Sequence, residues 1–436
     1  MNSSPFSGPG SCGSTGHLSR RTLLKLAGWS SLAWLTPIAR QLAQAEERAP
    51  SGRPARSVII LWLAGGPSQL ETFDPHPGSK IAFGTKAIRT ALPGVQLADG
   101  LGHLAEMMGD VTLVRSVVSP EADHERAVYN MKTGYRPVTT LVHPALGAVL
   151  CHQMPDDAMD LPRHISILPD QWPARGGYLG AAFDAFKLQD PQGPVQDVAL
   201  TVSAARQERR FADVAVVEKA FARGRAPSLD ENVTQHGQAM ERARRLMGSA
   251  QLAAFDVNQA PASQRAAYGD TPFGRGCLAA LRLIEQGVRC VEVTLDGWDT
   301  HANNHELQGR RVAQLDPAFA ALLRDLKARG LFESTIVLCG GEFGRTPTLN
   351  PLGGRDHWPH GFSVAVAGGG FRRGHVFGAT DPGGDKKAPD QPVKVQDLHA
   401  TVQAALGLDP EKELQTPVGR PMALSDGRVR RELLAG

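Results

Sequence analysis

Residues 335–361 read TIVLCGGEFGRTPTLNPLGGRDHWPHG and combine a short apolar run with a loop rich in carboxylate and imidazole side chains. The run Ile336–Cys339 has the β-branched bias of a buried strand, and two glycines end it. The metal-binding side chain types that follow it are Glu342, Asp356, His357 and His360. Because ligands of an open α/β sheet bind at the carboxyl ends of its strands, the stretch predicts a divalent-metal site there. The alternative is a polar loop with incidental histidines.

The composition bounds the kind of protein. A chain of 436 residues with 42% hydrophobic residues is long enough for one large α/β domain or two ordinary ones. The formal net charge of +3 is small, and no basic run is interleaved with aromatic residues, so we expect no nucleic-acid partner. The five cysteines form no CxxC pair, which argues against a disulfide framework and against a thiolate zinc site.

The first residues have the pattern of an export signal. Ser19–Lys25, with paired arginines, precedes the apolar run Leu26–Leu35, and the small-x-small sequence Ala43–Ala45 follows. The pattern resembles a twin-arginine signal peptide over residues 1–45, with an ordinary secretory signal or an uncleaved anchor as the alternative. We therefore predict a periplasmic or secreted protein, exported by the twin-arginine route, whose mature chain starts near Glu46. No later segment approaches the ~18 apolar residues that a membrane span needs, so no transmembrane segment is expected after signal removal.

Apolar runs predict the strands of a sheet: Ser57–Ala64, Asp110–Ser116, Val288–Leu295, Thr335–Cys339 and Phe362–Ala367. Helical patterns separate them, and this alternation predicts an α/β fold with a doubly wound, mostly parallel sheet flanked by helices. We expect residues 46–436 to form a single domain. Within it, residues 155–267 have the least regular pattern and are predicted to be an insertion or cap.

A second group of metal-binding side chain types follows the predicted strand Val288–Leu295. Asp299 and His301 offer a carboxylate and an imidazole, the donors that a mixed metal site uses. Asp296 competes with Asp299 for the same role, and the spacing does not choose between them. His305 lies four residues after His301 and joins the site if that turn is helical.

A third polar segment opens a helix. Asp123, His124 and Arg126 follow the predicted strand Asp110–Ser116, at the amino terminus of a helical pattern that continues through Met131. Free backbone N–H groups at such a terminus favour anions. We predict that Asp123 or His124 acts as a catalytic general base or anion-binding partner, and that Arg126 holds the negative oxygens of a substrate.

These segments, in their order along the chain, resemble motifs of the alkaline phosphatase and sulfatase superfamily. Leu295–Asn303 looks like the phosphatases' strand, aspartate and histidine-alanine-asparagine sequence, and a helix follows it. Thr335–Gly344 is similar to a strand that ends in Asp-His-Gly, and His360 stands where the phosphatases carry their last metal-binding histidine. Ser119–Gly134 is similar to the sulfatase segment that begins with the nucleophile. The whole signature, over Arg56–Leu408, looks closest to domain-of-unknown-function family 1501 (DUF1501), which is typically exported. The resemblance implies an alkaline-phosphatase-like core.

The sequence departs from the superfamily pattern at several positions. Ala64–Gly66 stands where the superfamily has a metal-binding aspartate after the first strand. His124 stands at or beside the nucleophile position, so the resemblance implies no formylglycine chemistry. Phe343 replaces the histidine of the Asp-His pair and cannot bind a metal. Either Asp356 and His357 supply the missing ligand, or one of the superfamily's two metals is absent.

The candidate metal ligands are mixed nitrogen and oxygen donors: Asp299, His301, Glu342, Asp356, His357 and His360. Such a set suits zinc or manganese, or iron, better than calcium. The metal would polarise a phosphoryl or sulfuryl oxygen and activate a bound water as the nucleophile. Ser68 and Arg345 are the predicted substrate-binding residues, and Ser68 or Ser119 stays open as a nucleophile.

The sequence favours an exported metal-dependent hydrolase of phosphate or sulfate esters, with an anionic small-molecule or glycan ester as its substrate. The alternative is a non-catalytic binding or scaffolding protein that keeps the superfamily fold. The missing aspartate after the first strand and the absence of a hydroxyl or thiol at His124 favour this alternative.

Overall fold

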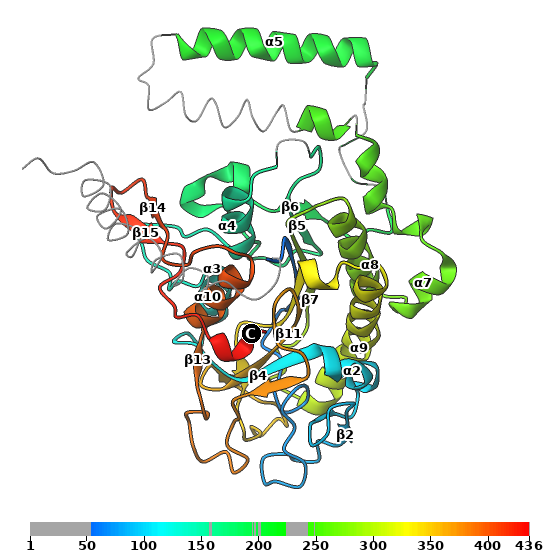
Figure 1. Ribbon diagram of the computed structural model, residues 1–436, viewed down its shortest axis with the longest axis vertical. Coiled ribbons are helices and arrows are strands. Elements are labelled where there is room, and N and C mark those ends of the chain that lie inside the picture. Colours follow the sequence, from blue (N-terminus) through cyan, green and yellow to red (C-terminus); the bar gives the residue numbers. More distant parts are fainter. Residues whose placement is uncertain are drawn as a thin grey trace, which may run out of the picture. The chain divides into compact units, whose positions relative to one another are not determined.

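The computed structural model describes residues 54–435, except for 157–158, 194, 196–197, 199–201, 224–242 and 248. The predicted signal peptide, residues 1–45, lies outside these described residues. Figure 1 shows the described chain as a central sheet with helices on both of its faces. None of the helices in this part of the chain is both long enough and apolar enough to cross a membrane.

Within the described residues, the central sheet has nine strands in the order β12-β4-β11-β8-β1-β7-β5-β6, and β13 also pairs with β4. They are β1 (Ser57–Leu63), β4 (Val111–Val118), β5 (His164–Ile167), β6 (Phe186–Leu188), β7 (Cys290–Leu295), β8 (Thr335–Gly340), β11 (Phe362–Gly368), β12 (His375–Phe377) and β13 (Val393–Lys394). β1 pairs in parallel with β7 and β8, whereas β11 runs antiparallel between β4 and β8. The sheet is therefore mixed but mostly parallel, and the predicted doubly wound α/β fold is confirmed.

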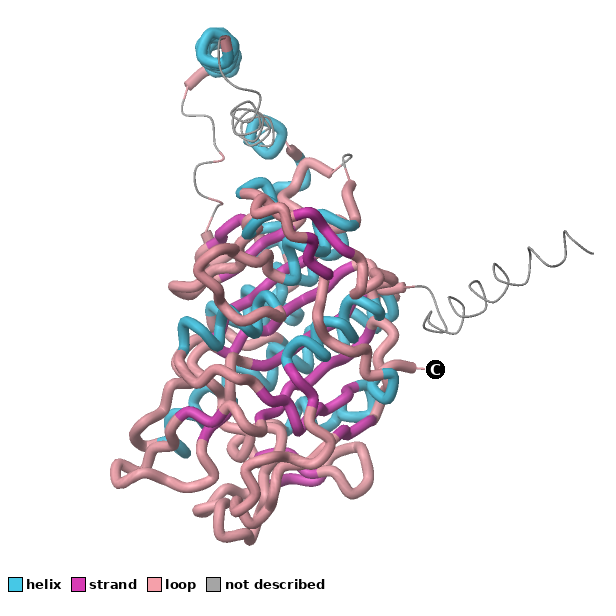
Figure 2. Tube along the Cα trace, turned by 90° about the vertical axis from the view of Figure 1, so that its left-hand side faces the viewer, coloured by secondary structure: helices cyan, strands magenta, loops and turns pink. Residues whose placement is uncertain are grey.

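The main helices are α2 (Gly102–Met107), α3 (His124–Thr133), α4 (Leu146–Gln153), α5 (Ala204–Ala222), α7 (Ala262–Ala267), α8 (Pro272–Glu285), α9 (Asn304–Ala328) and α10 (Val395–Ala405). Figure 2 shows strands lying between helices. Ile59, Leu61 and Leu63 of β1 face the core that α8 and α9 cover, whereas Val58 and Trp62 face the core beneath α3 and α10. Because both faces of β1 are buried, its sequence is an unbroken apolar run, which is the signal that predicts it.

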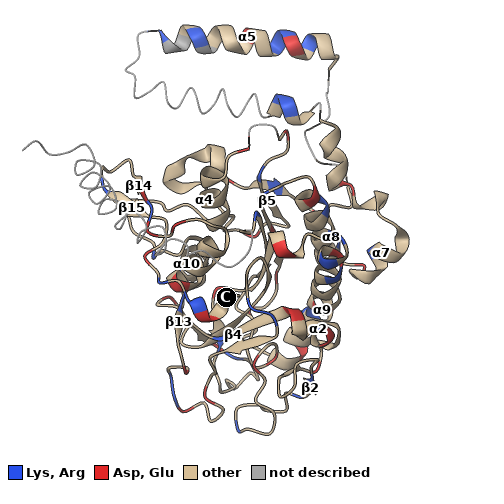
Figure 3. Cartoon of the chain, viewed as in Figure 1, with Lys and Arg blue, Asp and Glu red and all other residues tan. Residues whose placement is uncertain are grey.

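Two-stranded ribbons lie outside the central sheet: β2 (Ala87–Arg89) with β3 (Gln96–Ala98), β9 (Gly344–Arg345) with β10 (His357–Trp358), and β14 (Glu413–Gln415) with β15 (Pro421–Ala423). The β9–β10 ribbon folds the 335–361 stretch back on itself and sets Arg345 opposite His357. The cap at 155–267 stays a prediction, although β5 and β6 within that range belong to the central sheet. Figure 3 shows basic residues interspersed with acidic ones along the described elements.

The ends of α3 follow from its sequence. Asp123 caps its start, since Oδ1 accepts a hydrogen bond of 3.2 Å from the backbone N–H of Arg126. Gly134 ends it with φ 79°, a left-handed conformation that favours glycine. A Cβ at Gly134 would also lie 2.9 Å from Cγ of His399 on α10. The cap and this close contact fix His124, the first residue of α3, relative to the rest of the fold.

His399 makes the stability of the fold depend on pH. It is buried, and its Nε2 donates a hydrogen bond of 2.8 Å to the carbonyl oxygen of Met131. Burial lowers the pKa of His399 from 6.5 to about 4, against the opposing effect of that hydrogen bond. The unfolded chain therefore takes up a proton more readily than the folded one. The free energy of unfolding is expected to fall, by up to about 3 kcal/mol, as the pH drops from about 6.5 toward 4.

The variant His399→Gln, which keeps a donor for Met131, is expected to flatten this dependence. Urea denaturation at about pH 7.5 and about pH 5 should show a smaller loss of unfolding free energy for the variant than for the wild type. Burial also lowers the pKa of His164, but that residue is common to both proteins, so the comparison isolates His399. Equal losses in the two proteins would contradict the assignment.

Candidate metal centre

The polar segments predicted from the sequence meet at one edge of the sheet. β1, β7 and β8 are parallel neighbours, and β4 runs the same way because β11 is antiparallel to both β4 and β8. Their carboxyl ends therefore lie at a common edge. His124 begins α3 after β4, the loops after β7 and β8 carry Asp299, His301 and Glu342, and the β9–β10 ribbon adds His357.

His357 presents one ring nitrogen to the cluster and uses the other to fix its orientation. Its Nδ1 lies 2.8 Å from the backbone carbonyl oxygen of Ala122. A carbonyl oxygen only accepts, so Nδ1 carries the proton. In the neutral ring Nε2 is then the nitrogen with the lone pair, and it lies 3.4 Å from Oδ1 of Asp299. Metal-binding histidines have this arrangement, in which the second ring nitrogen donates to a carbonyl or a carboxylate.

Two further histidines repeat the arrangement with carboxylates. The Nδ1 of His301 lies 2.8 Å from Oδ1 of Asp356. The Nδ1 of His124 lies 2.7 Å from Oε1 of Glu342. Their Nε2 atoms turn toward Asp299, at 3.0 Å from Oδ1 for His301 and 3.3 Å from Oδ2 for His124. The contact of His124 lacks hydrogen-bond geometry, so its buried Nε2 has no hydrogen-bond partner among the residues that the structure describes.

The Nε2 atoms and the Asp299 carboxylate form a donor set for a cation. The Nε2 atoms of His301 and His357 lie 3.1 Å apart, which is repulsive for two lone pairs unless a proton or a cation is shared between them. The 3.3 Å between Nε2 of His124 and Oδ2 of Asp299 matches the spacing of neighbouring ligands of a tetrahedral zinc, which is about 3.3 Å because Zn–N bonds are about 2.0–2.1 Å long. One ligand atom each from His124, Asp299 and His357 lies within 4.8 Å of the others. These residues fit a divalent cation, and their nitrogen and carboxylate donors suit zinc or manganese.

Arg345 binds the protein itself rather than facing outward. Its side chain is fully buried, and Nη2 donates to Oδ1 of Asp299 at 2.5 Å. Its other hydrogen bonds go to the backbone carbonyl oxygens of Gly65, Gly66 and Arg355. The sequence predicts Arg345 as a substrate-binding residue, but the structure uses it to hold Asp299 in place.

The charges of the cluster stabilise one another. Burial by itself would raise the pKa of Asp299, but its imidazole and guanidinium neighbours outweigh burial and hold that pKa well below its ordinary value. Burial would lower the pKa of His124, yet the carboxylates of Asp299 and Glu342 raise it to about 9. Without a cation, His124 is therefore protonated at neutral pH. A bound cation would take the place of that proton, so metal binding is expected to release it.

Glu342 lies behind His124. Its Oε1 accepts a hydrogen bond of 2.9 Å from the backbone N–H of Gly65 as well as the bond from His124. Its Oε2 is buried and has no hydrogen-bond partner within the described part of the chain. Glu342 thus determines which nitrogen of His124 faces Asp299.

The ring of Phe343 forms an apolar floor under the imidazoles. It is fully buried, stacks on His357 with 4.3 Å between ring centroids, and lies 4.9 Å from the ring of His124. A Cβ on Gly66 would lie 2.5 Å from the Phe343 ring, so the turn after β1 needs glycine at this point. The residue that breaks the superfamily pattern therefore orients the ligands instead of binding a metal.

The structure brings together most of the predicted site residues: His124, Asp299, His301, Glu342, Arg345, Asp356 and His357. His360 is separate from this cluster. It packs edge-on against Trp358 and lines a small cavity beside Thr380. Ser68 is buried with an unpartnered hydroxyl, and no hydrogen bond between described residues joins it to the cluster.

Asp123 and Arg126 have structural partners close to the cluster. Asp123 is the cap of α3, and Arg126 binds both carboxylate oxygens of Glu121, at 2.7 Å and 3.1 Å.

Of the two competing aspartates, Asp299 joins the cluster, whereas Asp296 is exposed and accepts a hydrogen bond from the backbone N–H of Gly297. His305 lies elsewhere, since its Nε2 is 3.1 Å from the hydroxyl of Thr85.

The sequence reasoning missed one aromatic residue of the site. Trp172 lies in the loop after β5, and its ring is almost parallel to that of His124, with 6.3 Å between centroids and 13° between planes. It belongs to the irregular 155–267 region and to none of the motifs. Its position after a short strand at the same edge of the sheet is the only signal that pointed to it.

Comparison with known proteins gives a family and a set of distant folds. The family model described as protein of unknown function (DUF1501) matches residues 55–434. The chain is similar to the PsFucS1 sulfatase from Pseudoalteromonas sp., at 11% identity and a TM-score of 0.39, covering 85% of this chain and 72% of that one. It is also similar to a protein in the alkaline phosphatase superfamily from Vibrio parahaemolyticus, at 10% identity and a TM-score of 0.36, covering 83% and 68%. No curated protein matches the sequence. At these scores the structural likeness carries no conclusion about activity.

Replacement of His357 tests the metal centre. The wild type is expected to bind zinc or manganese, and His357→Ala should weaken that affinity by more than about 100-fold, because even outer partners of ligands contribute about 10–100-fold. Competition with a chromogenic chelator measures the dissociation constants. His360→Ala is the matched control, since His360 lies apart from the cluster, and its affinity should equal that of the wild type. An equal loss in both variants, or none in either, would contradict this ligand set.

Proposed function

This chain belongs to the DUF1501 family, whose model matches residues 55–434, and from the geometry of its site we propose that it is a metal-dependent hydrolase of singly charged phosphate or sulfate esters. The observation that supports the proposal is the convergence of three imidazole Nε2 atoms on the carboxylate of Asp299 at the carboxyl edge of the sheet. Ligands of such sheets bind at this edge.

His124, Asp299 and His357 are the residues that would hold the cation. When bound, the cation would polarise a phosphoryl or sulfuryl oxygen and lower the pKa of a water molecule. Glu342 keeps His124 in the tautomer that offers Nε2, and Phe343 keeps water away from the inner side of the imidazoles. A covalent intermediate is not needed, which fits the lack of a hydroxyl or thiol at position 124.

His301 and Asp356 form a carboxylate–imidazole pair beside these ligands, and both are about half exposed, at 45% and 57%. Nε2 of His301 is the atom that would take a proton from the attacking water or give one to the leaving group. Asp356 orients the ring through the 2.8 Å contact with Nδ1 and stabilises the protonated form. In this proposal the general base is His301, while Asp123 serves as a helix cap.

The charges around the cluster favour a substrate with a single negative charge. Asp299, Glu342 and Asp356 supply three carboxylates against the guanidinium of Arg345, so a divalent cation brings the centre only to neutrality. Arg345 is fully buried and bound to protein, and Arg126 is held by Glu121. Neither of the predicted arginines is free to neutralise a second charge. Sulfate esters and phosphodiesters are monoanions, whereas phosphate monoesters are dianions at neutral pH.

We further propose that the chain meets its substrate outside the cytoplasm, after export by the twin-arginine route. The support is the sequence pattern of residues 1–45. The twin-arginine route carries folded proteins, which suits a metal centre assembled before export. An anionic small molecule or a glycan ester is the proposed substrate class.

A panel of aryl esters tests the proposed activity. The metal-loaded mature protein is expected to hydrolyse p-nitrophenyl sulfate or bis-p-nitrophenyl phosphate with a kcat/KM at least about tenfold above that for p-nitrophenyl phosphate, since one uncompensated charge costs roughly 1.4 kcal/mol or more. A chelator should abolish the activity and added metal should restore it. Asp299→Asn is the inactive control. Stoichiometric metal without any ester hydrolysis would instead support the binding or scaffolding alternative, and a preference for the dianion would contradict the charge argument.

A variant that frees Arg126 from Glu121 tests whether the lack of a free arginine causes the expected preference for singly charged substrates. In Glu121→Gln the carboxylate that holds Arg126 and Arg136 is neutral, so both guanidinium groups become available to an anion. The ratio of kcat/KM for p-nitrophenyl phosphate to that for p-nitrophenyl sulfate should rise roughly two- to fivefold, the effect of an exposed charge interaction. Glu125→Gln removes one negative charge four residues further along the chain, in the first turn of α3, without releasing an arginine. An equal rise in both variants would mean that net charge alone, and not Arg126, sets the preference.

A further inference from the structure

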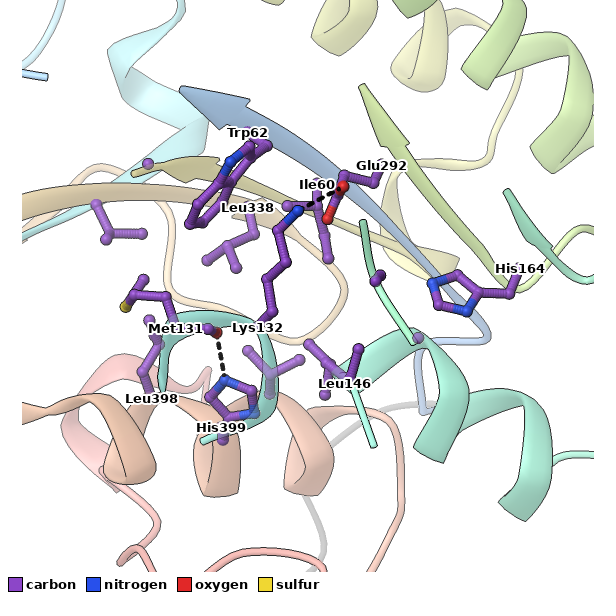
Figure 4. Close-up of a pocket in the computed structure, with 16 residues that line it drawn as sticks. Ile60, Trp62, Met131, Lys132, Leu146, His164, Glu292, Leu338, Leu398 and His399 are labelled. Atoms are coloured by element: carbon purple, nitrogen blue, oxygen red, sulfur yellow. Dashed lines mark hydrogen bonds and ion pairs between the residues drawn. The ribbon is translucent and has the colours of Figure 1, made fainter. Parts of the chain in front are cut away.

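A buried ion network lies at the other end of the helix that begins with His124. Lys132, in the last turn of α3, has a side chain only 7% exposed. Its ammonium group donates to Oε1 of Glu292 at 3.0 Å and lies 3.5 Å from Oδ1 of Asp170. Glu292 is in the middle of the central strand β7, with 2% of its side chain exposed. Figure 4 shows Lys132 reaching across the cavity wall to Glu292 beside Trp62.

Stability alone does not account for this network. Removing a carboxylate and an ammonium group from water costs several kcal/mol per ion, and apolar replacements of buried ion pairs are often neutral or stabilising. A cavity of about 30 Å³ adjoins Lys132, and its apolar wall includes Ile60, Leu146 and Leu338. The site could therefore be filled by an apolar side chain. The network has a second set of contacts, and these lead to the candidate metal centre.

The network fixes the backbone of Trp172 on both sides. The carbonyl oxygen of Trp172 accepts from the ammonium group of Lys132 at 2.8 Å. Its N–H donates to Oδ1 of Asp170 at 2.9 Å, and Oδ2 of Asp170 accepts from the indole N–H of Trp62 at 2.9 Å. The loop begins at Leu168, whose φ of 54° is unfavourable for a leucine. Contacts rather than local preference therefore hold this loop in place.

The ring of Trp172 in turn packs on a ligand of the centre. It lies nearly parallel to the imidazole of His124, whose Nδ1 is bonded to Glu342 and whose ring also contacts the rings of Phe343 and His357. The bond to Nδ1 alone would leave the imidazole free to tilt about that bond. Together with Phe343 and His357, the parallel indole restricts this tilt and keeps Nε2 of His124 directed at Asp299.

We propose that Lys132 is a positioning residue of the metal centre: from inside the fold it fixes Trp172 against His124 and so holds that ligand in its binding orientation. The inference rests on the proposed metal centre and not on any particular substrate. The proposal also explains the buried carboxylates of Glu292 and Asp170, because they hold the ammonium group of Lys132 where it can bind the carbonyl oxygen of Trp172.

The test compares the metal affinity of two variants in the full mature protein. Lys132→Met keeps an unbranched apolar chain beside the cavity but removes the donor for Trp172, and we expect it to weaken zinc affinity about tenfold. Comparison of the wild type with Trp172→Phe identifies the part of the near-ultraviolet circular dichroism that comes from Trp172. Lys132→Met should change that part of the spectrum. Ser166→Ala is the matched control, because it removes a 3.2 Å hydrogen bond to the same carboxylate of Glu292 without touching Trp172. Its zinc affinity and dichroism should equal those of the wild type.

Each outcome either supports or overturns the proposal. Unchanged zinc affinity in Lys132→Met, whatever its melting temperature, would overturn it and leave Lys132 a purely structural residue. If Lys132→Met does not fold, Trp172→Leu takes its place with the same expected loss of affinity, and unchanged affinity in that variant would equally overturn the proposal. If the wild type binds no zinc or manganese, the proposed function fails separately. The side-chain 15N resonances of His124 then test the positioning, which is overturned if they are the same in wild type and variant.

Discussion

The buried guanidinium of Arg345 is the interaction on which the candidate centre depends. It donates to the carbonyl oxygens of Gly65 and Gly66 in the turn after β1, to that of Arg355 just before β10, and to the carboxylate of Asp299 after β7. The guanidinium group of this one residue thus joins the loops of three strands. Removing the carboxylate of Asp299 would leave the fully buried guanidinium without its carboxylate partner, which is unfavourable because a buried charge needs compensation. The position of the central carboxylate is therefore part of the fold itself and cannot vary independently of it.

The strands of the sheet could be predicted because burial on both faces leaves a clear signal. The run at Ser57–Ala64 became β1 and the run at Phe362–Ala367 became β11, each within a residue of the expected end. The antiparallel direction of β11 could not be predicted, since a strand buried on both faces is apolar whichever way it runs. The sequence at Ile165–Pro169 suggested a strand, which became β5 (His164–Ile167), whereas β6 is too short to show a period of two, and its pairing to β5 identifies it.

The residue types of the candidate site could be predicted, but their individual tasks could not. Carboxylates and imidazoles after strand ends are visible in the sequence, and most of those named do meet. Whether an arginine faces solvent or lies buried depends on partners far along the chain, as with Arg345 and Asp299, which are 46 positions apart. An aspartate at a helix start fits both a catalytic base and a cap, and Asp123 has the geometry of a cap. Trp172 has no motif, because its role comes from a single ring contact and a buried lysine.

The departures from the superfamily pattern form one consistent arrangement. Phe343 cannot bind a metal, yet its ring supports His357, whose Nδ1 is fixed by the carbonyl oxygen of Ala122 just before α3. In the proposed centre, His357 of the β9–β10 ribbon would therefore be the ligand that Phe343 cannot be, and its ring is held by the residues just before α3. An imidazole at that helix start can hold a cation but cannot form the covalent ester that a hydroxyl forms. In the proposal His124 is therefore a ligand rather than a nucleophile, and the proposed hydrolysis is by direct attack of water, with His301 as the group that moves the proton.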